Sequence, residues 1–216
     1  MANSNQTMSQ KQLVQLSKSL SYVLRHGAEK LKLKIRSDGF ILLSEVLALP
    51  QHRGYTVEHV MYVVDNNDKK RFEVTTIEGQ LYIKARQGHT IQVQDLHLKK
   101  IENPKDIPVV VHGTYMKAWP SIKEGGLSKM ERNHIHFAKA EYGSAEVISG
   151  MRSTCNLYIY VDAEKAMNDG IEFFESENGV ILSSGVSGII HPKYFKYVLK
   201  TPALAPFDSD FPNAKP

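Results

Sequence analysis

The sequence has a single cysteine, Cys155, so the chain cannot close an internal disulfide. It also lacks any apolar run near the roughly 18 residues that a membrane-spanning helix needs. Its start, MANSNQTMSQKQ, has no apolar segment of the kind found in secretory signals. These absences predict a soluble globular protein that works inside the cell, in the cytoplasm or the nucleus, with no membrane partner.

Several motifs of nucleotide and catalytic sites are also absent. There is no GxGxxG and no GxxxxGK(S/T), so neither a Rossmann dinucleotide site nor a Walker phosphate loop is predicted. A GxSxG elbow, a HExxH helix and a CxxC pair are missing as well. A nucleotide, if the chain binds one, must be held in some other way.

The charge balance is slightly basic. Lys and Arg number 27 against 23 Asp and Glu, which gives a net charge of +4. A polyanion would be attracted modestly, but charge alone does not make a nucleic-acid protein, because many basic enzymes never contact one.

Apolar residues recur at helical spacing in three places near the N-terminus. The first predicted helix ends at Gly27 as its C-cap, the second stops near Pro50, and the third is N-capped by Thr56. Their apolar positions are Leu13, Leu16, Leu20, Val23 and Leu24 in the first, Leu42, Leu43, Val46 and Leu47 in the second, and Val57, Val60, Met61 and Val64 in the third.

The pattern then changes to alternation. Phe72 and Val74 share one face, and Glu78-Gly79 turns the chain into LYIKA, which predicts a β-hairpin. Three helices followed by a hairpin predict a winged-helix-like lobe over residues 1–100. The polar segment 97–108, with its two prolines, is typical of a boundary between compact units.

Beyond this boundary the chain is rich in short strand patterns. The segments VVVHGT, HIHFA, LYIYVD and GVILSSG read as strands, with helices at 116–124 and 162–169. A β-rich lobe over residues 101–200 follows, so the whole chain is predicted to be α+β. The segment 201–216 has four prolines and little pattern, and we expect it to be a mobile tail.

Three arginines and a histidine stand out as candidates for a phosphate site. Arg25 and His26 end the first helix, where a cation is also explained by the helix C-terminus. Arg71 and the nearby Lys69 could equally be a solvated basic turn. Arg152, flanked by small residues, is a third arginine, and three guanidiniums with an imidazole at one spot would cradle a phosphate.

Histidines form the second group of candidates. His112-Gly113-Thr114 follows an apolar strand, but a histidine at a strand end is often only structural. His134 and His136 alternate along one predicted strand, so a metal site is one alternative for this pair. No cysteine or carboxylate has a matching spacing, and we expect no metal.

Long motifs in a fixed order give a more specific signal, from about Ser17 to Leu199. They are SKSLSYVLRHGA, SDGF, DKKRFEV, ARQGHTI, VVHGTYMKAWPSIKEGGLSKMERNHIHFA, SGMR and FFESENGVILSSG. With these motifs the chain resembles the tRNA 2′-phosphotransferases. The resemblance implies a winged-helix lobe joined to an ADP-ribosyltransferase-like lobe that binds NAD⁺ without a Rossmann fingerprint.

The resemblance also implies site residues. The family's four essential side chains fall here on Arg25, His26, Arg71 and Arg152, and we expect Lys69 to join the first three at the RNA phosphate. The implied NAD⁺ pocket comprises His112, Gly113, Thr114, Gly126, Leu127, Ser128, Arg132, His134, His136, Phe174, Asn178, Gly179 and Val180.

The implied activity is the last step of tRNA splicing. The internal 2′-phosphate of the RNA passes to NAD⁺ through an ADP-ribosylated RNA 2′-phosphate, without a metal. The products are 2′-hydroxyl RNA, nicotinamide and ADP-ribose 1″,2″-cyclic phosphate. Two alternatives remain open: an ADP-ribosyltransferase that acts on terminal phosphates of nucleic acid, and a non-catalytic RNA-binding module. We expect a monomer.

Overall fold

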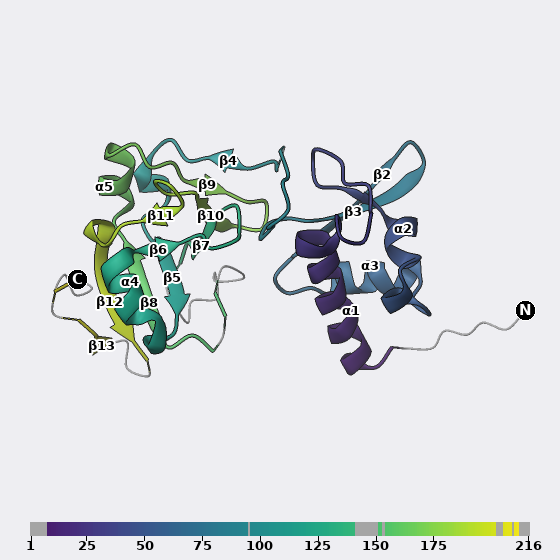
Figure 1. Ribbon diagram of the computed structural model, residues 1–216, viewed down its shortest axis with the longest axis horizontal. Coiled ribbons are helices and arrows are strands. Elements are labelled where there is room, and N and C mark those ends of the chain that lie inside the picture. The colour runs from purple at the N-terminus through teal and green to yellow at the C-terminus, as the bar shows by residue number, and fades with distance from the viewer. Residues whose placement is uncertain are drawn as a thin grey trace, which may run out of the picture. The chain divides into compact units, whose positions relative to one another are not determined.

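The fold is that of a computed structural model, which describes residues 8–94, 96–140, 151–152, 154–201, 205–208 and 210–211. The chain divides into two compact units, Met1–Leu96 and His97–Pro216, each with its own core (Figure 1). Both units combine helices with antiparallel strands, so the predicted α+β class is confirmed. Among the described residues, no helix is long and apolar enough to cross a membrane.

The first unit contains the three predicted helices and the predicted hairpin. Its elements are α1 (Gln10–Tyr22), a π-helical turn (Val23–Gly27), β1 (Ile41–Leu42), α2 (Leu43–Leu47), a 3₁₀ turn (Pro50–His52), α3 (Val57–Asp65), β2 (Phe72–Ile77) and β3 (Gln80–Ala85). The strands form a sheet of order β1-β3-β2.

Capping residues fix where the two longer helices begin. Ser9 caps α1 and Thr56 caps α3, each in a capping box completed by the side chain three residues on. Thr56 therefore has the predicted role. The core-facing side of α1 and of the π-helical turn is also as predicted, since Leu16, Leu20 and Leu24 are at most 1% exposed.

The hairpin turn follows from two adjacent residues with positive φ. Glu78 has φ 50° and Gly79 has φ 77°, as a two-residue turn with right-handed strand twist requires. The turn sets the register Phe72↔Ala85 through Ile77↔Gln80. This register places Phe72, Ile83 and Ala85 in the core with Val60 of α3.

The second unit is built around one large antiparallel sheet. Its strand order is β13-β12-β8-β5-β7-β10-β9-β4, and β11-β6 forms a separate pair. The bounds are β4 (Lys99–Lys100), β5 (Val111–Thr114), α4 (Trp119–Gly125), β6 (Leu127–Ser128), β7 (Ile135–Ala138), β8 (Leu157–Val161), α5 (Ala163–Asn168), β9 (Phe174–Glu175), β10 (Val180–Ser183), β11 (Ile189–Ile190), β12 (Phe195–Lys200) and β13 (Ala205–Pro206). Short 3₁₀ turns occur at Pro104–Asp106, Met116–Ala118 and Pro192–Tyr194.

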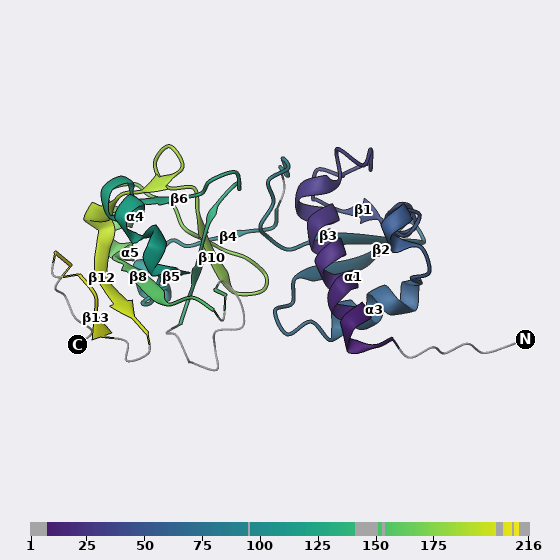
Figure 2. The same cartoon turned by 60° about the horizontal axis from the view of Figure 1, so that its bottom comes forward.

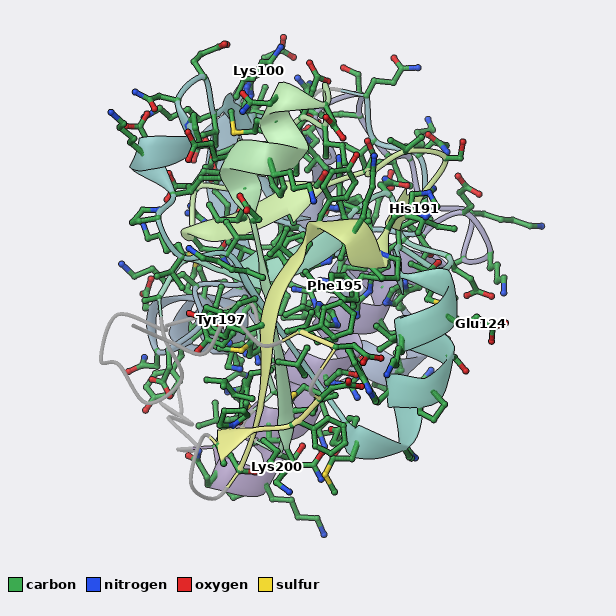
Figure 3. All side chains as sticks on the ribbon, turned by 90° about the vertical axis from the view of Figure 1, so that its left-hand side faces the viewer. Lys100, Glu124, His191, Phe195, Tyr197 and Lys200 are labelled. Carbon is green, nitrogen blue, oxygen red and sulfur yellow. The ribbon has the colours of Figure 1, made fainter. Side chains whose placement is uncertain are left out.

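All four strands predicted in the second unit are present, and the longest strand that was not predicted is β12, next to the edge strand β13. β12 pairs with β8 along most of its length, and α4 lies beside it in both ribbon views (Figure 2). Figure 3 shows Phe195 and Lys200 at opposite ends of β12 and Glu124 on α4 to one side. The ring of Phe195 packs 6.3 Å from that of Trp119, which joins strand and helix in one core.

The described part of the predicted tail packs against this unit. Ala205–Pro206 pairs with β12, and Phe207 and Phe211 lie with their rings about Trp119. The indole Nε1 of Trp119 donates a hydrogen bond of 2.8 Å to Asp208. The sequence predicted a loose tail because four prolines interrupt any periodic apolar pattern. Phe207 and Phe211 are nevertheless ordered against the core of the second unit. The predicted mobility of the remaining residues, which lie outside the described ones, stays a prediction.

Candidate functional site

Arg25 and His26 lie in the π-helical turn that ends α1, where a distant loop holds them. Thr90 donates its backbone N–H to the carbonyl of Arg25 at 2.9 Å. Its Oγ1 lies 3.1 Å from Nδ1 of His26. This contact orients the imidazole and thereby determines the direction in which its Nε2 points.

Gly88 of the same loop lets the chain approach Arg25 closely. It has φ +90°, and a Cβ at this position would lie 3.4 Å from Nε and 3.5 Å from Cζ of Arg25. A larger residue would therefore carry both a strained backbone and a contact on the guanidinium. The loop after β3 packs around the side chain that the sequence predicts to bind phosphate.

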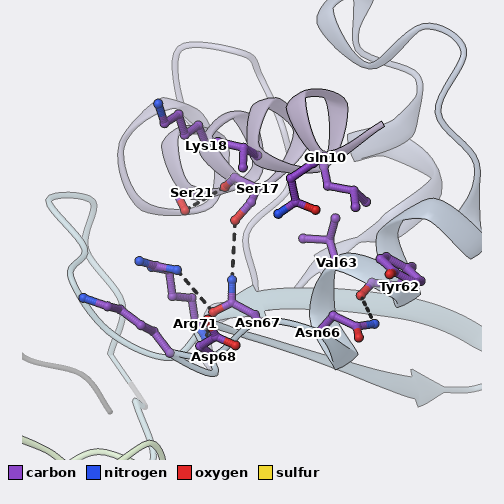
Figure 4. A pocket seen from close by; sticks show the side chains of 13 residues that line it. Gln10, Ser17, Lys18, Ser21, Tyr62, Val63, Asn66, Asn67, Asp68 and Arg71 are labelled. Carbon is purple, nitrogen blue, oxygen red and sulfur yellow. Dashed lines mark hydrogen bonds between the residues drawn. The ribbon is translucent and has the colours of Figure 1, made fainter. Parts of the chain in front are cut away.

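Arg71, the residue before β2, is held by Asn67. Oδ1 of Asn67 accepts hydrogen bonds from the backbone N–H of Arg71 at 3.1 Å and from its Nη1 at 3.3 Å (Figure 4). Burial lowers the pKa of the Arg71 guanidinium, and the carboxylate of Asp68 opposes this effect. Arginine stays charged at any ordinary pH, so a lowered pKa marks a cation that would gain from an anionic partner.

The end of β3 connects these positions within the first unit. Arg86 donates its backbone N–H to the carbonyl of Arg71, and the loop that follows reaches Arg25 through Thr90. Arg152 belongs to the second unit, so its convergence with the first-unit residues stays a prediction. Of the small residues around it, Ser149, Gly150 and Ser153 lie outside the described residues.

In the second unit, His112 on β5 has a defined hydrogen bond. Its Nδ1 donates to the carbonyl of His136 on β7 at 2.9 Å, so the neutral ring keeps Nε2 as an acceptor. Burial lowers the pKa of His112, with Arg132 lowering it further and the bond to His136 opposing both. The chain therefore favours a neutral imidazole that can accept a hydrogen bond from a hydroxyl.

His134 does not alternate with His136 on one strand, because β7 begins at Ile135. The ring of His134 instead lies 6.4 Å from that of Phe174 on β9. Burial lowers the pKa of His134, and Lys129 adds to this effect. Among the described residues no group of three His, Cys, Asp or Glu side chains is arranged to hold a metal ion.

Two arginines of the second unit lie near one another. Burial lowers the pKa of Arg132, and the charge of Arg152 lowers it further. The hydroxyl of Tyr115, which follows the His-Gly-Thr triplet, is 2.8 Å from Oγ1 of Thr154. Hydrogen bonds from Thr154 and then from Arg152 lower the pKa of Tyr115. Arg152 thus lies beside the end of β5, with a second cation nearby.

The predicted Gly126-Leu127-Ser128 segment ends α4 and forms β6. Gly126 has φ +90°, and a Cβ there would lie 2.5 Å from the carbonyl oxygen of Ile190 on β11. Leu127 is 2% exposed, so its side chain belongs to the core and only its backbone can face a ligand. Ser128 accepts a hydrogen bond from the N–H of Met130 at 3.0 Å.

The last predicted pocket residues have structural partners in the turn between β9 and β10. Oδ1 of Asn178 accepts a hydrogen bond of 2.8 Å from Ser176, and Gly179 donates its N–H to the carbonyl of Ser176. Val180 is 0% exposed. These contacts explain Asn178 and Val180 without a ligand, and a role for them in binding stays a prediction.

The sequence matches the family model described as RNA 2′-phosphotransferase, Tpt1 / KptA family, over residues 11–185. The chain belongs to this family. The match confirms the resemblance that the motifs indicate.

Three relatives show the extent of the similarity. The tRNA 2′-phosphotransferase 1 of Danio rerio is 52% identical over 187 residues, which cover 84% of this chain and 83% of that protein. The tRNA 2′-phosphotransferase 1 of Homo sapiens is 49% identical over 191 residues, with 87% and 76% covered. A Schizosaccharomyces pombe relative is 52% identical over 186 residues, and the chain spans only 51% of that protein.

The Tpt1 / KptA chain holds its candidate residues with side chains that the sequence analysis did not single out. Thr90 contacts His26, Asn67 contacts Arg71, and Gly88 leaves open the space beside Arg25 that a Cβ would occupy. The motif ARQGHTI contains Thr90 and Gly88, but no local pattern assigns them a task. Only the folded chain shows these contacts.

Proposed function

We propose that this chain is an RNA 2′-phosphotransferase that removes the internal 2′-phosphate left in spliced tRNA. The observation that carries the proposal is membership of the Tpt1 / KptA family over most of the chain, with relatives named tRNA 2′-phosphotransferase. The geometry of the first unit supports it, because Arg25, His26 and Arg71 are each held by a neighbouring side chain or loop. A preorganised set of cations is what a phosphoryl group requires.

The phosphate acceptor in this proposal is NAD⁺, which supplies the ADP-ribose that carries the phosphate away by way of an ADP-ribosylated RNA 2′-phosphate. The donor set of the second unit fits a dinucleotide. His112 offers a neutral acceptor for a ribose hydroxyl, and Arg132 is a cation for a pyrophosphate. Phe174 and His134 add an aromatic wall.

In this proposal the first unit is a winged-helix-like lobe that holds the RNA phosphate, and the second is an ADP-ribosyltransferase-like lobe. Three helices with a hairpin in one unit and an antiparallel sheet in the other support the two assignments. The reaction gives 2′-hydroxyl RNA, nicotinamide and ADP-ribose 1″,2″-cyclic phosphate. The protein acts as a monomer inside the cell.

Each charged side chain has a proposed task. Arg25, His26 and Arg71, with Lys69 beside them, bind the oxygens of the 2′-phosphate and orient it, and positioning alone accelerates such a transfer greatly. Arg152, together with Arg71, stabilises the charge that builds on the phosphoryl oxygens in the later step. Fixed guanidiniums take the part that a metal ion plays in many phosphoryl transfers, so no metal is required.

The test is to incubate the purified protein with a short RNA that bears one internal 2′-phosphate, with and without NAD⁺ and with EDTA. Mass spectrometry should show NAD⁺-dependent, EDTA-resistant loss of the phosphate and a matching ADP-ribose cyclic phosphate. A stable ADP-ribosylated RNA as the only product would indicate the rival ADP-ribosyltransferase. RNA binding without any reaction would indicate a binding module.

A further inference from the structure

A groove runs between α1 and α3 in the first unit and ends at Arg71 (Figure 4). Its volume is about 680 Å³, within the range of roughly 300–1,000 Å³ that is typical of ligand sites. The lining residues are Gln10, Leu13, Val14, Ser17, Lys18, Ser21, Tyr62, Val63, Asn66, Asn67, Asp68, Lys69 and Arg71. Apart from Lys69 and Arg71, none of them has a task in the proposed reaction beyond holding Arg71 in place.

One face of α1 forms the first wall of the groove. Its residues follow the helical spacing i, i+3, i+4, i+7, i+8 and i+11 from Gln10 to Ser21, so they form a continuous stripe. The stripe is separate from the core positions Leu16 and Leu20, which are 0% exposed. The stripe combines the polar or charged side chains of Gln10, Ser17, Lys18 and Ser21 with the apolar ones of Leu13 and Val14.

The charge of the groove suits a polyanion. Its lining holds three cations, Lys18, Lys69 and Arg71, against one carboxylate, Asp68. A groove with net positive charge attracts a nucleic-acid backbone and tracks its phosphates. Uncharged hydrogen-bonding side chains, Ser17 and Asn66 among them, also line the groove.

The groove also exposes an aromatic ring and an apolar side chain. Tyr62 of α3 is 52% exposed and Val14 of α1 is 43% exposed, two of the six large hydrophobic residues that are exposed among those described. A single exposed tyrosine is ordinary, but here it shares a cationic groove. Aromatic side chains in cationic grooves are the platforms on which unpaired bases stack.

Asn67 connects the groove to the candidate phosphate site. Its Nδ2 is 3.5 Å from Oγ of Ser17 on α1, while its Oδ1 accepts the two hydrogen bonds from Arg71. A chain lying in the groove therefore continues directly to the guanidinium that we propose holds the 2′-phosphate.

The hairpin is another surface of this unit that could contact RNA, but its lysine is already paired with a carboxylate. Lys84 of β3 is 2% exposed and lies 3.2 Å from the carboxylate of Glu73. The turn itself carries Glu78, an acidic residue. The groove is therefore the better surface for an RNA backbone.

We propose that the groove between α1 and α3 binds the single-stranded RNA that flanks the 2′-phosphate. A base of this flank stacks on Tyr62, and neighbouring phosphates contact Lys18 and Lys69. This inference rests on the proposed function, because it assigns a subsite to the RNA of that reaction.

The experiment compares two substrates and one binding ligand. The substrates are a short RNA with several nucleotides on both sides of the 2′-phosphate and a 2′-phosphorylated dinucleotide without flanks. The binding ligand is a single-stranded RNA of the same sequence without the 2′-phosphate, followed by fluorescence anisotropy. The variants are Tyr62→Ala, Tyr62→Phe, Lys18→Gln and, as a control on the same helix but outside the groove, Lys11→Gln.

Tyr62→Ala should reduce the preference for the flanked RNA over the dinucleotide by about tenfold, the magnitude of one base–aromatic stack, mainly through KM. It should weaken anisotropy binding by a similar factor, while Tyr62→Phe keeps the ring and stays within about twofold. Lys18→Gln should make the slope of log affinity against log salt shallower by about 0.7, and Lys11→Gln should leave that slope unchanged.

Two results would overturn the proposal. One is an unchanged RNA affinity and substrate preference in Tyr62→Ala and Lys18→Gln, as expected if the groove holds a protein segment instead. The other is an equal loss on both substrates, which would mean general damage to the catalytic residues. If the proposed function itself were wrong, the wild-type protein would release no phosphate from either substrate. The anisotropy measurements would still show whether the groove binds single-stranded RNA.

Discussion

The imidazole of His26 is oriented by Thr90, a residue 64 positions further along the chain. Thr90→Val keeps the shape of the side chain and removes Oγ1, so the ring loses the contact at Nδ1. We expect kcat/KM for 2′-phosphorylated RNA to fall by about fivefold to tenfold, since a net hydrogen bond contributes on the order of 1 kcal/mol. Steady-state kinetics with the flanked RNA measures the change.

Thr90→Ser is the matched control, because it keeps the hydroxyl and loses only a methyl group. It should retain most of the activity. The dependence of kcat/KM on pH is a second measurement, and simple loss of packing would not shift it. If Thr90 sets the tautomer of His26, this pH profile shifts in Thr90→Val and does not shift in Thr90→Ser. Equal losses in both variants would show that the hydroxyl has no such role.

His112 gives a second prediction at this scale, which concerns stability against pH. Burial lowers its pKa below the ordinary value of 6.5, so the folded chain binds the proton less readily than the unfolded chain does. Stability then rises with pH wherever the unfolded state holds more protons. The contribution of neutral His112 is therefore fully present above about pH 6.5 and is lost as the pH falls towards the lowered folded value.

The measurement is urea unfolding followed by the emission of Trp119, the only tryptophan in the chain, at several pH values between about 5.5 and 8. The free energy of unfolding of the second unit should decrease on the acid side, and His112→Asn should flatten this decrease. His134 shifts in the same direction, so some pH dependence remains in the variant. A decrease of the same size in wild type and variant would contradict the assignment to His112.

At the residue scale the sequence identified charged candidates and missed the residues that hold them. Arg25, His26 and Arg71 stand in long motifs and could be named directly. Thr90 and Gly88 have no such signal, because their contacts join parts of the chain more than 60 positions apart. A local pattern cannot contain a contact that only the fold creates.

At the scale of elements, the apolar periodicity predicted the helices and strands that are long enough to repeat it. The helices α1 and α3 run over several turns, and the β2–β3 hairpin runs over several residue pairs. An apolar pattern can therefore repeat within each of them. Strands of two residues, such as β6 and β11, have no period of their own and exist because their partners align them. β12 was not predicted, because Tyr197, Val198 and Leu199 are buried one after another and break the alternation that Phe195 and Lys196 begin.

Replacing either of the two adjacent glycines at the end of α4 with alanine should change the stability of the protein, in opposite directions. Gly125 is helical and a Cβ there would meet nothing within 4 Å, so Gly125→Ala should stabilise the protein by about 0.5–1 kcal/mol through helix propensity. Gly126 has φ +90° and its Cβ would meet the Ile190 carbonyl at 2.5 Å. Gly126→Ala should therefore destabilise by about 1–3 kcal/mol or more.

Urea unfolding with Trp119 emission compares the two variants, because Trp119 is the first residue of α4. The midpoint should rise in Gly125→Ala and fall in Gly126→Ala. A rise in both variants would show that the turn into β6 relaxes to accept a side chain, and a fall in both would contradict the gain expected at Gly125. The affinity for NAD⁺ should be measured as well. If Ser128 lies at the proposed NAD⁺ pocket, displacement of β6 should weaken this affinity in addition to lowering stability.

At the scale of the whole molecule, the sequence predicted two units and an α+β class, and the chain has two compact units with separate cores. The signal was a change of pattern, from helical spacing to strand alternation, with a polar segment between. The sequence alone could not show how far the cations that we propose bind phosphate extend over the surface. The groove beside Arg71 arises from two helices whose facing stripes are each ordinary on their own.

The last prediction follows from this distribution of charge. The net charge is only +4, so a steep salt dependence would have to come from local clusters such as Lys18, Lys69 and Arg71. Three phosphate contacts to single-stranded RNA give a log–log slope of about −2, so the affinity for RNA should fall on the order of tenfold between about 50 and 200 mM salt. The KM for NAD⁺ should change much less, because that ligand carries few charges. Kinetics at several salt concentrations, with each substrate varied in turn, separate the two. A flat response for the RNA would mean that its backbone does not contact these cations, and a response equally steep for NAD⁺ would mean that salt acts on the protein as a whole.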